Sequence, residues 1–141
     1  MKKVAVLAFG NPLRCDDGIP SRILKNLKGN FDKYYMETNV DILTILRKYD
    51  EVVIIDTVEG KNAGEIQMMD ISKLNSKFYS SHEFSWPGVL KIAEKMGIKL
   101  PKITFFGIVP KRIDIGTKIS KELKERIPYY CAKIQKFLKS L

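Results

Sequence analysis

A small group of side chains in this sequence has the chemistry of metal ligands. Asp16 and Asp17 follow the first apolar segment, Asp56 ends a later apolar segment, and His82 is the only histidine of the chain. Two carboxylates and one imidazole suit a divalent ion such as nickel, zinc or manganese, and three protein ligands leave coordination positions for water or a substrate. We therefore predict an open metal site in which Asp56, His82 and an aspartate of the adjacent pair Asp16 and Asp17 hold the ion.

Each of these residues also has an ordinary structural role open to it. Asp16 and Asp17 are residue types that cap helices or hold turns, and a helix is predicted directly after them. Asp56 would need only water or a hydrogen-bonding partner at the end of its strand, and a single histidine is more often a surface or capping residue than a ligand. Cys15, beside the acidic pair, is predicted to be a small buried or inert thiol.

The segments that deliver the acidic residues have the pattern of buried parallel strands. Residues 3–9 and 51–56 are dominated by apolar and β-branched side chains, which is typical of strands covered on both faces. The first run ends at Gly10-Asn11-Pro12, where glycine permits a close approach of the backbone and asparagine can hold the turn or bond to a peptide. Open α/β sheets bind ligands at the carboxyl ends of their strands, so we place the site at this edge.

The remaining segments alternate between strand and helix patterns. Strands are predicted at residues 34–37, 64–71 and 103–109, and helices at 19–27, 40–48, 85–96 and 117–141, with a break or kink at Pro128. This order predicts an α/β fold with three α/β/α layers and a mainly parallel central sheet. The length of 141 residues predicts a single domain over residues 1–141.

The composition is that of a globular protein from a reducing compartment. No apolar run approaches the roughly 20 residues of a membrane helix, and the two cysteines form neither a disulfide framework nor a thiolate metal motif. The first apolar segment lacks a signal-peptide cleavage site, so we expect a cytoplasmic protein without membrane insertion. A net charge of +9 permits a nucleic-acid partner, but a solvated lysine-rich helix face explains it better, and no nucleic-acid partner is expected.

Four ordered segments carry a resemblance to a known family. GNPLRCDDG at residues 10–18 is similar to the G-N-x-L-x-x-D-[DE]-G opening of the nickel-iron hydrogenase maturation endopeptidases, and SSHE at 80–83 matches their [ST]-x-H segment. The strand VVIIDT at 52–57, followed by GEI at 64–66, resembles the second acidic site of that family, and FGIVP at 106–110 resembles its closing G-[IV]-x-P strand. Together the segments cover the chain from residue 3 to about 110.

The resemblance implies a phosphorylase/hydrolase-like fold and a specific reaction. Asp17, Asp56 and His82 would be catalytic residues and metal ligands, and Gly10 with Asn11 would contact the substrate. That substrate would be the nickel-loaded precursor of a hydrogenase large subunit, whose C-terminal extension is removed by one cut. The substrate would present the nickel, which polarises the scissile carbonyl or activates water, and another divalent metal such as zinc could bind in isolation.

The chain departs from the family pattern at two places. Residues 18–20 are Gly-Ile-Pro where the family usually continues the acidic pair with D-G-x-G, and a proline fits the first turn of a helix. Residues 37–40 are Glu-Thr-Asn-Val where many members carry a D-G-G-T-like loop for substrate recognition. Thr38 and Asn39 are therefore the expected substrate contacts of a divergent subgroup.

Three other functions fit parts of the pattern. A phosphoacceptor receiver domain would use Asp16, Asp17, Asp56 and Lys111, although the acidic pair lies beyond a loop and the order Pro110-Lys111 is reversed. A peptidyl-tRNA-hydrolase-like enzyme would use the basic C-terminal half to contact phosphates, but the expected tyrosine and histidine near the opening loop are missing. The third alternative is a noncatalytic scaffold. The oligomeric state is left open by all of these patterns.

Overall fold

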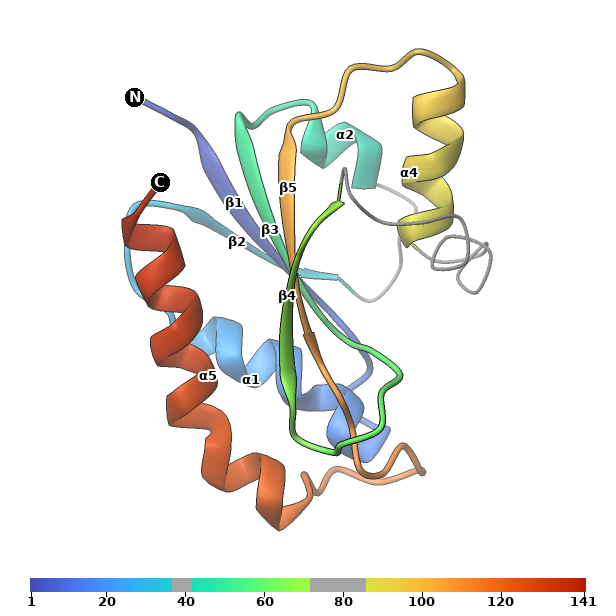
Figure 1. The fold of residues 1–141 in the computed structure, drawn as a ribbon, viewed down its shortest axis with the longest axis vertical. Helices are drawn as coiled ribbons and strands as arrows, with labels where there is room; N and C mark the ends of the chain where they lie inside the picture. The colour runs from blue at the N-terminus through green and yellow to red at the C-terminus, as the bar shows by residue number, and fades with distance from the viewer. Residues whose placement is uncertain (37–41, 72–85) are drawn as a thin grey trace.

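The computed structural model describes residues 1–36, 42–71 and 86–141, which form one five-stranded sheet with helices on both faces (Figure 1). The strand order is β2-β1-β3-β5-β4. The strands are β1 (Val4–Phe9), β2 (Asp32–Met36), β3 (Glu51–Thr57), β4 (Ile66–Asp70) and β5 (Lys102–Ile108). The first four strands of this order are parallel, and β4 pairs antiparallel to β5 at the edge.

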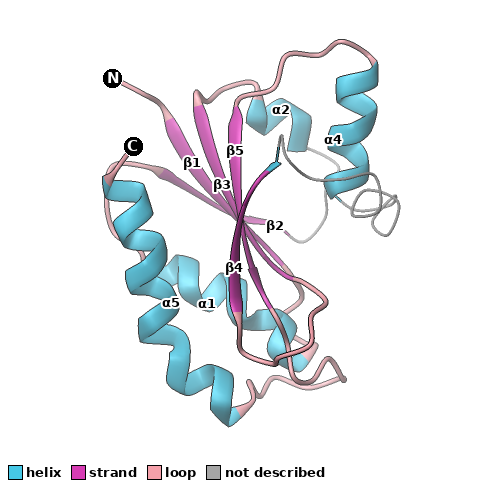
Figure 2. Ribbon diagram, viewed as in Figure 1, coloured by secondary structure: helices cyan, strands magenta, loops and turns pink. Residues whose placement is uncertain are grey.

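The helices form two outer layers, which confirms the three-layer prediction (Figure 2). The helical elements are η1 (Cys15–Gly18), α1 (Ile19–Asn26), α2 (Ile42–Leu46), α4 (Trp86–Lys95) and α5 (Lys121–Lys139). The α1–α5 pair covers one face of the sheet, and the α2–α4 pair covers the other. Among the described residues, no helix is long and apolar enough to cross a membrane.

The continuous apolar runs of the central strands follow from burial on both faces. Leu7, Ile54 and Phe105 belong to the core under α2 and α4, whereas their chain neighbours Val6 and Ile55 belong to the core under α1 and α5. Successive side chains of a strand point to opposite faces, so both sets must be apolar when helices cover both faces. The central strands predicted from these runs are therefore confirmed.

Several predicted boundaries differ from the structure by one to four residues, and the strand predicted at 64–71 spans Ile66–Asp70. The strand predicted from residue 34 begins two residues earlier, at Asp32, and the last helix begins at Lys121 and not at residue 117. Ser120 has extended backbone angles and donates its N–H to a distant carboxylate, so the helix cannot begin before it. Of the break or kink predicted at Pro128, the break is wrong, because the helix continues through this residue while buried Leu123 and Ile134 hold its two halves against the sheet.

The register of the sheet gathers the motif residues at one edge. Ala8 pairs with Ile55, which brings the Gly10 turn beside the end of β3. Asp56 pairs in turn with Gly107 of β5. The carboxyl ends of β1, β3 and β5 therefore meet at the edge that the sequence pattern predicts for ligand binding.

Candidate active site

The turn after β1 brings the backbone of Asp17 against Gly10. Gly10 has φ +131°, and a Cβ atom at this position would overlap the carbonyl oxygen of Asp17. Glycine is therefore required both for its backbone conformation and for the space. The side chain of Asn11 accepts a hydrogen bond from the N–H of Leu13 at 2.9 Å, so its oxygen holds the turn.

The carboxylate of Asp17 is held by one donor on each oxygen. The N–H of Asn11 donates to Oδ2 at 2.8 Å, and the hydroxyl of Thr57 donates to Oδ1 at 2.8 Å. The first donor comes from the turn after β1 and the second from the end of β3. Asp17 is partly exposed, and each of its oxygens keeps acceptor capacity for a cation or a substrate donor.

Asp56 is held in the same way at the end of β3. The indole Nε1–H of Trp86 donates to Oδ2 at 2.9 Å, and the N–H of Thr57 donates to Oδ1 at 2.8 Å. Trp86 is 2% exposed and its ring packs against Phe9 and Phe105, with ring centroids 6.0 and 5.1 Å apart. The aromatic core under α4 therefore fixes the direction of the Asp56 carboxylate.

Burial makes the charge on Asp56 costly. It raises the pKa of Asp56 to about 7, the hydrogen bonds from Trp86 and Thr57 oppose the rise, and the nearby charge of Asp17 adds to it. The two carboxylates are thus close enough to repel each other across Thr57, which bonds to both. A cation between them would relieve the repulsion, so the pair fits a divalent ion by its donor chemistry.

The structure brings together Asp17 and Asp56, the two carboxylates of the predicted site. Their companion His82 lies outside the described residues, as do Thr38 and Asn39. Gly10 lies beside Asp17 as a part of the turn that supports the site. The assignment of His82 as the third ligand stays a prediction from its motif.

The other aspartate of the pair, Asp16, has a different environment. Its side chain is fully buried, and its Oδ2 accepts hydrogen bonds from the N–H groups of Lys111 and Arg112, each at 2.9 Å. Ser120 adds its N–H to Oδ1 at 2.6 Å and its hydroxyl to Oδ2 at 2.7 Å. Asp16 does not cap the helix that follows it. It binds instead the connection between β5 and α5, about a hundred residues further along the chain.

These contacts disfavour the receiver-domain alternative. Four hydrogen bonds occupy the carboxylate of Asp16, which that alternative needs as part of an exposed acidic site. The ammonium group of Lys111 pairs with Glu122 at 2.7 Å, on the exposed start of α5. Neither residue is free for the role that a receiver domain would require.

Cys15 is buried, as predicted for an inert thiol. It is 4% exposed and has φ +48°, and its N–H donates to the carbonyl of Gly116 at 2.9 Å. A Cβ atom at Gly116 would lie 3.1 Å from the Cys15 sulfur. Cys15 therefore packs the opening loop against the β5–α5 connection.

The supporting residues Thr57, Trp86 and Ser120 were not predicted. Thr57 follows Asp56 directly, and Trp86 is the only tryptophan of the chain, with an N–H that needs an acceptor when buried. These two features of the sequence could have indicated that both residues support the site. Nothing in the sequence near Ser120 indicates a partner at Asp16.

The chain is similar to several known proteins. The family model described as hydrogenase maturation protease matches residues 38–136. Protein FrxA of Pyrococcus furiosus is 30% identical over 122 residues, covering 80% of this chain and 88% of FrxA.

Solved structures share the fold. The hydrogenase maturating endopeptidase HybD from E. coli has a TM-score of 0.77 at 18% identity, covering 98% of this chain and 93% of that one. The NiFe hydrogenase maturation protease HybD from Thermococcus kodakarensis has a TM-score of 0.72 at 23% identity, covering 96% of this chain and 98% of that one.

Replacing the two adjacent aspartates should affect stability very differently. Asp16→Ala leaves four partly buried donors without their acceptor and should lower the free energy of unfolding by about 3–5 kcal/mol. Asp17→Ala removes two hydrogen bonds at a partly exposed position and relieves repulsion with Asp56, so it should cost about 1 kcal/mol or less. Urea unfolding followed by circular dichroism measures both values. Equal losses for the two variants would contradict the structural role of Asp16.

Replacing Asp56 should change how stability depends on pH. A carboxyl group whose pKa is raised in the folded state stabilises the protein below its unfolded pKa, near 4, and this contribution is lost as the pH rises through about 7. The stability of Asp56→Asn relative to wild type should therefore increase between pH 4 and pH 8, by about 1–4 kcal/mol. Any hydrogen bond lost in the variant changes the free energy of unfolding by the same amount at every pH. A difference that stays constant with pH would contradict the raised pKa.

Proposed function

This chain belongs to the hydrogenase maturation protease family, and we propose that it removes the C-terminal extension of a nickel-loaded hydrogenase large-subunit precursor by one peptide-bond cut. The family makes the chain a peptidase that acts in hydrogenase maturation. The observation that carries the finer proposal is the pair of carboxylates Asp17 and Asp56, held by separate donors at the carboxyl edge of the sheet. Nickel is then cargo of the substrate and not a resident cofactor.

In the proposed site, Asp17, Asp56 and His82 hold the nickel that the substrate presents. Asn11, Thr57 and Trp86 hold the two carboxylates in place, so little reorganisation is needed when the substrate arrives. When bound, the ion supplies a Lewis acid that polarises the scissile carbonyl or activates water. Zinc or another divalent ion would occupy the same ligands in isolation.

The substrate contacts are proposed at Gly10, Asn11, Thr38 and Asn39. The oxygen of Asn11 is used by its own turn, so its amide NH₂ is the group that would donate to a peptide carbonyl. Gly10 would contribute by the absence of a side chain, because its backbone already touches Asp17. Thr38 and Asn39 are proposed from the position of their loop in the family pattern.

Cleavage of a precursor tests this function. The wild-type protein, incubated with a nickel-loaded large-subunit precursor from the same source, should release a C-terminal peptide detectable by mass spectrometry. Asp17→Asn, Asp56→Asn and His82→Ala should each slow the cut by about 100-fold or more, because each removes a ligand of the ion.

The matched control is Asp114→Asn, since this exposed carboxylate pairs with Arg112 and is not one of the proposed ligands. This variant should cleave like wild type. If the wild-type protein leaves every nickel-loaded precursor of that source intact, the proposed substrate is wrong. Full activity of Asp17→Asn would show that the ligand assignment is wrong.

Divalent ions should stabilise the isolated protein. Nickel or zinc that binds only the folded state raises stability by RT ln(1 + [L]/Kd), or about 2.7 kcal/mol at a hundredfold excess over Kd. Differential scanning fluorimetry should show a higher Tm for wild type with the ion, and a smaller increase for Asp17→Asn. The same increase in both proteins would contradict binding at Asp17.

A further inference from the structure

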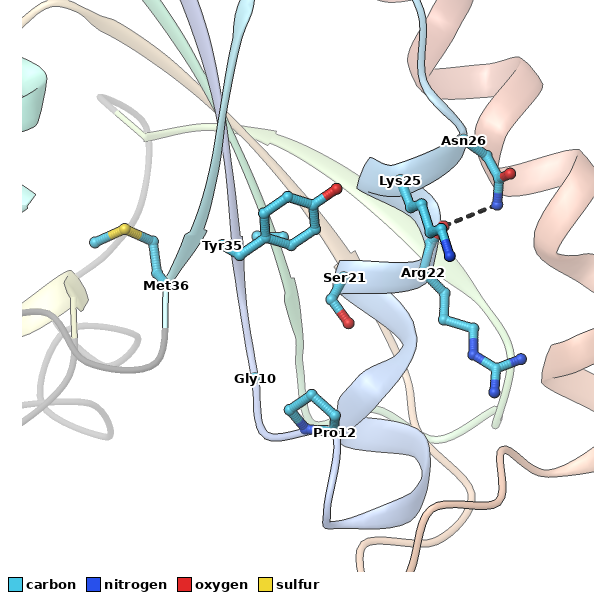
Figure 3. Close-up of a pocket in the computed structure, with 9 residues that line it drawn as sticks. Gly10, Pro12, Ser21, Arg22, Lys25, Asn26, Tyr35 and Met36 are labelled. Carbon is cyan, nitrogen blue, oxygen red and sulfur yellow. Dashed lines mark hydrogen bonds between the residues drawn. The ribbon is translucent and has the colours of Figure 1, made fainter.

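A cationic groove lies between β2 and α1, beside the candidate active site. Its volume is about 630 Å³. The lining includes Gly10, Pro12, Ser21, Arg22, Lys25 and Tyr35. Figure 3 shows Tyr35 on β2 with its ring directed toward α1, and Pro12 at the end of the groove near Gly10. The groove is therefore built by the end strand of the sheet, one helix and the opening turn.

The chemistry of the groove favours an anionic ligand with some apolar surface. Arg22 and Lys25 are exposed on α1, and none of the described lining residues is acidic. Within the described parts of the chain, no carboxylate pairs with either cation. Tyr35 is 52% exposed and offers an aromatic face beside them. Guanidinium and ammonium groups bind carboxylates through charge-assisted hydrogen bonds.

The groove is continuous with the carboxylate pair through the turn after β1. Gly10 lines the groove and also touches the backbone of Asp17, whose carboxylate accepts the N–H of Asn11. The stretch from Ser21 to Lys25 rises about 6 Å along the helix, which matches about two residues of an extended peptide. A peptide passing over Gly10 would reach both places.

We propose that this groove binds an acidic peptide segment of the substrate protein next to the bond that is cut. This inference rests on the proposed function and deepens it. Arg22 and Lys25 determine specificity by pairing with glutamate or aspartate side chains of the substrate, and Tyr35 packs against its backbone or apolar side chains. The occupant is a peptide and not a nucleic acid, because the groove adjoins the candidate active site of a peptidase, whose substrate is a polypeptide.

The first test compares two double variants in the cleavage of the precursor. Arg22→Gln with Lys25→Gln removes both charges of the groove, whereas Lys124→Gln with Lys136→Gln removes two charges from exposed positions of α5. The groove variant should raise KM about 5- to 20-fold with kcat changed less than about 2-fold, because lost ground-state contacts weaken binding alone. The α5 variant should match wild type, and added salt should shrink the difference. Equal KM values for both variants would overturn the proposal.

The second test does not depend on cleavage. Fluorescence anisotropy measures the binding of a labelled Glu-Ala repeat peptide, a Lys-Ala repeat peptide and a single-stranded oligonucleotide to the wild-type protein. Tighter binding of the Glu-Ala peptide, lost in the groove variant and kept in the α5 variant, supports the proposal. No preference for the Glu-Ala peptide, or tighter binding of the oligonucleotide at the same residues, overturns it.

The two tests separate the groove from the proposed function. If wild type cuts the precursor and the groove variant cuts it with the same KM, only the groove assignment fails. If wild type cuts no precursor, the proposed function fails, while selective binding of the Glu-Ala peptide still assigns an acidic peptide to the groove.

Discussion

The buried carboxylate of Asp16 is the interaction on which the carboxyl edge of the sheet depends. It accepts hydrogen bonds from the backbone of Lys111, Arg112 and Ser120, and so ties the loop after β1 to the connection between β5 and α5. A buried carboxylate is tolerated only when such donors replace water. These hydrogen bonds therefore hold both loops in one arrangement. They fix the start of α5 and the position of Asp17, the residue after Asp16.

Adjacent aspartates thus have opposite roles. The four donors around Asp16 leave it little capacity for a ligand, whereas Asp17 accepts one hydrogen bond on each oxygen at a partly exposed position. Asp56 resembles Asp17 in its two donors, but burial opposes its charge. A site of this kind is preorganised for a cation, since its carboxylates are aimed by neutral donors and destabilised by each other. That arrangement suits the proposed reaction, in which the substrate would bring the ion with it.

The positive charge of the chain divides into two parts. In α5 and the loop before it, two lysines pair with nearby acids, Lys121 with Glu125 and Lys111 with Glu122. These exposed pairs belong to a solvated surface and contribute little to stability. Arg22 and Lys25 differ, because they line a groove and no carboxylate among the described residues pairs with them. The net charge does not distinguish the paired lysines from Arg22 and Lys25, but the contacts of each side chain do.

The sequence by itself determined the layers, the central strands and the edge at which the site lies. Apolar runs covered on both faces, and acidic residues at their carboxyl ends, are local patterns that carry this information. Only the tertiary structure decided that Asp16 is structural and Asp17 available, that Thr57 and Trp86 hold the carboxylates, and that α5 begins at Lys121. The physical reason is that each of these depends on a partner far along the chain: Asp16 and Ser120 are 104 residues apart, and Asp17 and Thr57 are 40 apart. Local patterns do not show which distant donor will reach a given carboxylate.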